Sequence, residues 1–205
     1  MVRDEILARI RKATGPAQSD TPIAREYRQS ATLDATARLA QFTEILEDYN
    51  AGVHRCEESE LAPTIAQVLS ARSVHRLAIP PGLAESWLPA GFEFTRDTGL
   101  SHDELDRMEG ALTACTAAIS MTGTIMLSHS ETEGRRALTL IPDYHLCIVR
   151  ADQVVETVPQ GIRKLRECGG RPITTISGPS ATADIEMMRV KGVHGPRTLD
   201  VIVVS

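Results

Sequence analysis

Short apolar runs alternate with helix-like spacings along most of this chain, and this alternation constrains the fold more than any other feature. Apolar residues recur at helical spacing over residues 61–69 and 154–165. Strand-like runs occur at 53–56, 74–79, 92–95, 138–141, 146–149, 173–176 and 199–204. Strands that alternate with helices predict an α/β fold with a largely parallel sheet flanked by helices. The last run is almost wholly apolar, which is typical of a strand covered on both faces.

Two further stretches complete the predicted order of elements. Residues 111–127 mix Ala with Thr and Ile, and we expect a strand, a brief helical turn and a second strand there. Ser101 stands three residues before Glu104, a spacing typical of a capping box at the start of a helix. A short helix is therefore expected over residues 101–108.

The beginning of the chain has a different pattern, which predicts a helical extension with a polar arm. Residues 2–12 carry apolar side chains at fourfold spacing, and this spacing indicates a short helix. Residues 15–31 are polar and lack periodicity, whereas residues 32–50 contain an amphipathic helix. We therefore divide the chain into an N-terminal extension, residues 1–50, and an α/β domain, residues 51–205.

Composition and charge exclude several classes of partner. The chain has a net charge of −5, and aromatic residues make up only 3% of it. Base-stacking nucleic-acid modules are usually basic and show aromatic side chains, so nucleic acid is not an expected partner. The uncharged run at 110–128 is too short and too polar to span a bilayer, and the N-terminus lacks the apolar core of a secretory signal. We expect a cytoplasmic protein without a membrane span.

Positive charge gathers near the C-terminus. Residues 160–200 carry seven Lys or Arg against four Asp or Glu, which gives this segment a local charge of +3. Such an excess suits a small anionic ligand, and a solvated helix face accounts for it equally well.

The four cysteines, at positions 56, 115, 147 and 168, lie at least 21 residues apart. Local zinc and iron–sulfur motifs place ligands about two to four residues apart, so the sequence contains no such motif. We expect ordinary buried or half-buried thiols, and no metal or other cofactor held by this chain itself.

The stretch 173–186 is the strongest candidate for a binding loop. A strand leads into Ser177-Gly178-Pro179-Ser180, and a helix is expected to begin there with Ser180 or Thr182 as its cap. Glycine permits close approach of a ligand to the backbone, and free N–H groups at a helix start favour an anion. Ligands of open α/β sheets also bind at the carboxyl ends of strands. The alternative is a plain strand-to-helix turn.

A second loop, at residues 190–197, contains the histidine with the most freedom to approach a ligand. His194 lies between Gly192 and Gly195, and an imidazole can act as acid, base or hydrogen-bond donor near neutral pH. Arg197 can bind a carboxylate or a phosphate. The alternative is a hydrogen-bonded structural histidine in a turn.

Two shorter stretches supply further polar side chains. Asp143 and His145 lie two apart at a strand start and would face the same side, where they would form an acid–imidazole pair. A turn aspartate and a surface histidine are the alternative. Thr122-Gly123-Thr124 forms a polar turn before a strand.

Together these stretches resemble the lactate-utilization protein C family, whose module is the LUD domain. Residues 122–124, 140–145, 177–186 and 192–196 carry the resemblance. It covers about residues 50–205, so the α/β part is identified as a LUD domain. Two positions depart from the expected pattern: Met121 replaces an acidic residue, and Asp200 replaces a histidine.

The resemblance implies a fold similar to the CoA-transferase and ribose-5-phosphate-isomerase group. It also implies a role in the oxidation of L-lactate to pyruvate, with two iron–sulfur partner proteins that carry the clusters. The chain would then be a subunit of an oxidoreductase assembly, not a complete enzyme, and would bind a small anionic ligand. The predicted ligand-binding residues are Thr122, Gly123, Thr124, Ser177, Gly178, Pro179, Ser180, Ala181, Thr182, Asp184, Gly192, Gly195 and Arg197.

Two other functions stay open at this point. A free-standing enzyme of CoA-transferase-like or sugar-phosphate type would use Glu186 or His194 as nucleophile or base, and the 177–182 loop would bind its anionic substrate. A purely structural interaction module would use the glycine loops only to shape its surface.

Overall fold

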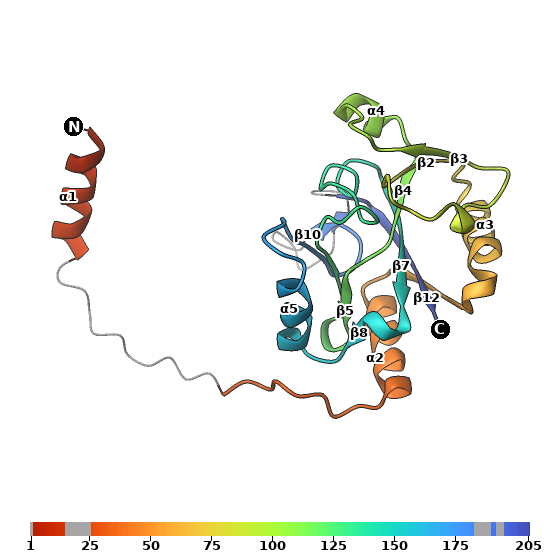
Figure 1. Ribbon diagram of the computed structural model, residues 1–205, viewed down its shortest axis with the longest axis horizontal. Coiled ribbons are helices and arrows are strands. Elements are labelled where there is room, and N and C mark those ends of the chain that lie inside the picture. Colours follow the sequence, from red (N-terminus) through yellow and green to blue (C-terminus); the bar gives the residue numbers. More distant parts are fainter. Residues whose placement is uncertain (1, 15–25, 183–189, 192–194) are drawn as a thin grey trace.

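Six parallel strands form the main sheet of the molecule (Figure 1). The structure is a computed structural model that describes residues 2–14, 26–182, 190–191 and 195–205. From one edge to the other, the strands are β1 (Gly52–Cys56), β12 (Thr198–Val204), β7 (Tyr144–Arg150), β4 (Gly110–Thr113), β2 (Arg76–Ile79) and β3 (Glu93–Arg96). Every neighbouring pair in this sheet is parallel, which confirms the predicted fold class.

A smaller sheet covers part of one face of the main sheet. Its strands, in order, are β8 (Val154–Val155), β5 (Ala117–Ile119), β6 (Thr124–Leu127) and β9 (Thr174–Ile176). β6 pairs antiparallel with both β5 and β9, whereas β5 and β8 are parallel. A separate two-stranded ribbon consists of β10 (Ala181–Thr182) and β11 (Val190–Lys191).

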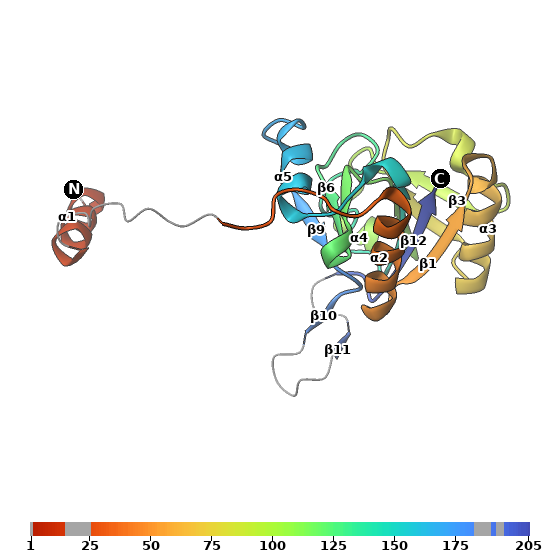
Figure 2. The same cartoon turned by 90° about the horizontal axis from the view of Figure 1, so that it is seen from below.

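Helices cover both faces of the main sheet (Figure 2). The α-helices are α1 (Val2–Thr14), α2 (Ala35–Asp48), α3 (Leu61–Arg72), α4 (His102–Asp106) and α5 (Val158–Arg166). Short 3₁₀ turns are η1 (Glu58–Glu60), η2 (Glu85–Trp87), η3 (Ser120–Thr122) and η4 (Ala151–Gln153). α3 packs on one face, and α2 packs on the opposite face beside the smaller sheet. The capping box of α4 is present as predicted, with Ser101 and Glu104 bonded reciprocally.

Alternate residues of the two central strands face the two layers of the core. In β7, Leu146 and Ile148 pack in the cluster that contains α3, whereas Cys147 and Val149 pack in the cluster that contains α2. β12 follows the same alternation, and its six residues from position 199 to 204 are all buried. Because both faces are covered, most residues of these strands are apolar, as the sequence predicts, and His145 in β7 and Asp200 in β12 are buried polar exceptions.

Two predicted elements differ from the structure. Residues 138–141 form turns, not a strand, because the backbone N–H groups of Leu138 and Ile141 bond to carbonyls three or four residues earlier. The buried Leu138 side chain accounts for the apolar pattern. The helix expected from residue 154 begins only at Val158, because the two residues of β8 pair with β5 instead.

The segment before α2 is fixed to the smaller sheet by one buried carboxylate. Glu156 is 1% exposed, and it accepts hydrogen bonds from the backbone N–H groups of Thr32 (2.6 Å) and Leu33 (2.8 Å) and pairs with Arg28. Phe42 of α2, a helix within the predicted N-terminal extension, is fully buried in the core. No helix among the described residues is both long and apolar enough to cross a membrane.

Candidate functional site

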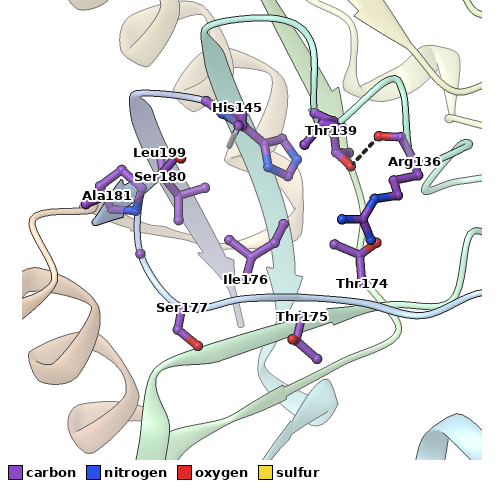
Figure 3. Close-up of a pocket in the computed structure, with 15 residues that line it drawn as sticks. Arg136, Thr139, His145, Thr174, Thr175, Ile176, Ser177, Ser180, Ala181 and Leu199 are labelled. Carbon is purple, nitrogen blue, oxygen red and sulfur yellow. Dashed lines mark hydrogen bonds between the residues drawn. The ribbon is translucent and has the colours of Figure 1, made fainter. Parts of the chain in front are cut away.

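A pocket of about 540 Å³ lies where the main sheet, β9 and the loop after β9 meet (Figure 3). Its described lining residues come from four stretches of the chain. They are Arg136, Thr139, Leu140, His145, Thr174, Thr175, Ile176, Ser177, Gly178, Pro179, Ser180, Ala181, Gly195, Pro196 and Leu199. The predicted loops at 177–182 and 190–197 therefore meet at one cavity, through Ser177–Ala181 on one side and Gly195 with Pro196 on the other.

The pocket lies at the amino ends of the central parallel strands, so the prediction of a site at their carboxyl ends is wrong. His145 and Leu199 are the second residues of β7 and β12. The binding loop follows β9, which belongs to the smaller sheet and pairs antiparallel with β6. The rule for open parallel sheets therefore does not apply to this loop.

No helix begins at Ser180, and the alternative predicted start after Thr182 lies outside the described residues. The Ser180 N–H donates to the Pro196 carbonyl (2.8 Å), and Ala181 pairs with Lys191 in the ribbon. These backbone groups are used in strand pairing and a cross-loop bond, so they do not form a helix N-terminus that could bind an anion. An anion bound at this turn would need a free Ser180 N–H group, but this group joins the two loops through its bond to Pro196.

Gly178 has the special backbone conformation that its sequence context suggests. Its φ of +79° lies in the left-handed region, and an added Cβ would approach the Cβ of Tyr49 to 2.7 Å. Any other residue there would be strained and would collide with the end of α2. The loop is thus held against α2 at the edge of the pocket.

The Thr122-Gly123-Thr124 turn meets the loop through a chain of hydroxyl groups. Thr122 Oγ1 and Thr124 Oγ1 are 2.7 Å apart, and Thr124 Oγ1 lies 2.8 Å from Ser177 Oγ. Figure 3 shows the Ser177 side chain pointing away from Ile176 and the rest of the pocket. The structure thus brings two predicted motifs together, and the turn at residues 122–124 contacts the 177–182 loop on the side that faces away from the pocket.

His145 is a buried residue that lines the pocket. It is 1% exposed, and its Nε2 lies 2.9 Å from Thr113 Oγ1 on the neighbouring strand β4. Burial lowers the pKa of His145 from 6.5 to about 4, so the imidazole is neutral at physiological pH. A neutral ring in this position can form hydrogen bonds to a ligand but carries no charge toward an anion.

The acid–imidazole pair of Asp143 and His145 does not form. Asp143 lies outside the strand and binds Arg197, whose Nε donates to Asp143 Oδ1 at 2.8 Å. Both side chains of this ion pair are more than half exposed. Arg197 therefore fixes the entry to β12, and it is not among the described residues that line the pocket.

Arg136 is a pocket residue that sequence reasoning missed. It follows Arg135, which binds the buried carboxylate of Asp97 through Nε (2.8 Å) and Nη2 (3.1 Å). Arg136 forms no ion pair with any residue that the structure describes, and it is the only formally charged residue among the described lining residues. The signal available in the sequence was the pair of adjacent arginines, Arg135 and Arg136. Because Asp97 binds only Arg135, Arg136 can bind a ligand.

Several predicted residues lie outside the described part of the chain. These are Asp184, Glu186, Gly192 and His194, and the Thr182 side chain is likewise not described. Within the described ranges, no group of three or more His, Cys, Asp or Glu side chains is placed to hold a metal ion. All four cysteines are free thiols, three of them buried.

Comparison with known proteins identifies the family. The family model of the LUD domain matches residues 39–204. The chain belongs to the LUD domain family. It is 47% identical over 184 residues to "Lactate utilization protein C" from Deinococcus radiodurans, a match that covers 87% of this chain and 85% of that protein. A second LUD relative with the same name, from Exiguobacterium sp., is 27% identical over 98% of this chain and 95% of its own length.

A solved structure supports the fold of this LUD domain. A crystal structure of a DUF162 family protein from Deinococcus radiodurans superposes with a TM-score of 0.74 at 41% sequence identity. The match covers 85% of this chain and all of that chain. The LUD match begins within α2, in agreement with the burial of Phe42 in the shared core.

Proposed function

We propose that this LUD protein is a subunit of an iron–sulfur system that oxidises L-lactate to pyruvate, and that it binds a small anionic ligand in the pocket. Relatives that match most of the chain are named for lactate utilization, which supports involvement in that process. The pocket supports the ligand, because it brings together two loops, one buried histidine and one arginine that has no ion-pair partner among the described residues.

The single observation that carries the binding role is the position of Arg136. A guanidinium without an ion-pair partner among the described residues, at a cavity of about 540 Å³, is suited to bind an anion. The other arginines near this region are already used, Arg135 by Asp97 and Arg197 by Asp143. Among the described lining residues, the site therefore has one available positive charge, which favours a small monoanion.

The electron carriers belong to partner proteins in this proposal. Oxidation of L-lactate to pyruvate releases two electrons and two protons, so the assembly needs a redox group. The cysteines of this chain are spaced too widely for a local cluster motif. We therefore assign the clusters to two iron–sulfur partners and the anion-binding pocket to this subunit.

The test is purification of the tagged full chain from its native host grown on L-lactate, with mass spectrometry and iron analysis. We expect two cysteine-rich, iron-containing partners in fixed ratio and lactate-dependent reduction of an electron acceptor. Arg136→Gln should lower that activity, whereas Arg150→Gln, which removes an exposed arginine paired with Glu58, should not.

A different outcome would redirect the assignment. An iron-free chain that purifies alone, from cells that oxidise lactate normally without it, would contradict the subunit role. Binding of CoA or a sugar phosphate would then favour the free-standing enzyme instead.

A further inference from the structure

The chemistry of the pocket narrows the ligand beyond a small anion, and this step rests on the proposed function. The described lining residues include one guanidinium and no carboxylate. A phosphate dianion or a nucleotide usually requires several cationic groups or a row of free backbone N–H groups. The Ser180 N–H is already bonded to Pro196, and Ala181 pairs in the ribbon, so these two residues do not contribute to such a row. A single guanidinium instead matches one carboxylate, which it can bind through two parallel hydrogen bonds.

His145 supplies the second feature of the site. Its ring is 1% exposed and lines the pocket, with Nε2 bonded to Thr113. No described residue forms a hydrogen bond to its Nδ1, so this nitrogen of a pocket residue is available to a ligand. Depending on the role that Thr113 takes, Nδ1 donates or accepts, and a hydroxyl group can satisfy either arrangement.

Arg136 and His145 line the same pocket, so a carboxylate with a neighbouring oxygen can use both groups. Figure 3 shows Arg136, Thr139 and Thr174 on one side of Ile176, Ser180 and Leu199 on the other, and His145 reaching in above. We infer that the pocket binds a 2-hydroxy or 2-oxo monocarboxylate, with its carboxylate on Arg136 and its 2-oxygen on His145.

The volume and the apolar lining of the pocket indicate the size and polarity of the rest of the ligand. Pockets of roughly 300–1,000 Å³ usually hold ligands much larger than lactate. Between the polar groups, the wall is apolar and is formed by Leu140, Ile176 and Leu199. Burial of additional methylene groups against such a wall strengthens binding. The site therefore accepts 2-hydroxy acids with alkyl groups longer than the methyl group of lactate, at least as well as lactate itself.

The experiment is calorimetric titration of the full chain with four probes. They are L-lactate, L-2-hydroxy-4-methylpentanoate, 4-methylpentanoate and inorganic phosphate. We expect the longer hydroxy acid to bind at least as tightly as lactate. We expect 4-methylpentanoate, which lacks the hydroxyl group, to bind about tenfold more weakly because Nδ1 of His145 stays unpaired. Phosphate should bind more weakly than either hydroxy acid.

Variants test each contact separately. Arg136→Gln should weaken binding of the hydroxy acids by about tenfold to a hundredfold, whereas Arg150→Gln should leave it unchanged. Thr113→Val should reduce the preference for the hydroxy acid over 4-methylpentanoate, because Thr113 orients the ring of His145. The comparison of the two pentanoates requires no substitution at His145, so a failure of a His145 variant to fold would not prevent the test.

Specific results would overturn the inference. These are phosphate binding tighter than the hydroxy acids, unchanged binding in Arg136→Gln, equal binding of the two pentanoates, or no binding of any carboxylate at millimolar concentration. None of these results contradicts membership in the lactate-oxidising assembly, which the purification tests by its partners. Conversely, a chain that purifies alone but binds 2-hydroxy acids would contradict the assembly and retain the ligand.

Discussion

His145 makes a specific prediction about the pH dependence of stability. Burial lowers the pKa of His145 from 6.5 to about 4 in the folded protein. An unfolded chain titrates histidine near 6.5. Between these two values the unfolded state binds a proton that the folded state does not bind. The free energy of unfolding therefore falls as the pH drops below 6.5, and this contribution becomes constant below about pH 4.

The size of this effect follows from the two pKa values. Each unit of difference corresponds to about 1.4 kcal/mol, so the loss of stability attributable to His145 amounts to about 3 kcal/mol over this range. His145→Gln lacks the titrating group. It should be less stable than the parent at pH 7.5, because the contact with Thr113 is disturbed. The difference between the two proteins should then shrink by about 2–3 kcal/mol as the pH falls to 4.5.

The assay is urea unfolding followed by circular dichroism at pH 7.5, 6.5, 5.5 and 4.5, for the parent and for His145→Gln and His145→Asn. All other titrating groups are shared, so the difference in unfolding free energy isolates His145. A difference that stays constant within about 0.5 kcal/mol over these pH values would refute a buried neutral histidine. It would also remove the neutral hydrogen-bonding group from the ligand site.

Three further perturbations test contacts that position the site. Arg72→Met leaves the fully buried carboxylate of Asp200 without its ion-pair partner and should cost about 3 kcal/mol in urea unfolding, whereas Arg150→Gln should change stability by less than about 0.5 kcal/mol. Gly178→Ala places a Cβ at a φ of +79° and 2.7 Å from a neighbouring side chain, so it should lower the unfolding free energy by about 1–3 kcal/mol and weaken ligand binding by calorimetry. Glu156→Gln should release the segment before α2, which limited proteolysis would detect as faster cleavage there with the core intact.

The parts of the fold that local pattern determines were predictable. β12 is apolar at nearly every position because both of its faces are covered, and the sequence shows this directly. The capping box between Ser101 and Glu104 is likewise a local bond whose spacing predicts it. Both features depend on residues that are neighbours in the chain or on burial that applies to a whole element.

The errors arise where hydrogen-bond partners lie far apart in sequence. Ser180 is one of the two helix caps that the sequence predicts, but its N–H group bonds to Pro196, and no local pattern indicates that partner. β9 was expected to be a buried strand of the parallel sheet, whereas it is a half-buried edge strand paired antiparallel with β6. In each case, tertiary pairing overrides what the local residues suggest.

The site itself shows the same division. Both glycine-containing loops were predicted to form it, and both contribute backbone to the pocket. The groups with specific chemistry come from elsewhere: His145 from the start of β7, and Arg136 from the turns between β6 and β7. Arg135 differs from Arg136 because it binds Asp97, and Asp97 lies far from both arginines in the sequence. A sequence pattern cannot show which of two adjacent arginines has a partner.

The position of the pocket connects binding to the stability of the whole fold. His145 and Leu199 belong to the main sheet, whereas Thr174 and Ile176 belong to the smaller one. A ligand that contacts both sets of residues therefore bridges the two sheets and binds only when they are assembled. By mass action, such a ligand at a hundredfold excess over its dissociation constant adds about 2.7 kcal/mol to the unfolding free energy. At the same ligand concentration, the tenfold to hundredfold weaker binding of Arg136→Gln should reduce that increment to about 0.4–1.4 kcal/mol. The ligand-free stability should be nearly unchanged, because Arg136 is exposed and has no ion-pair partner among the described residues.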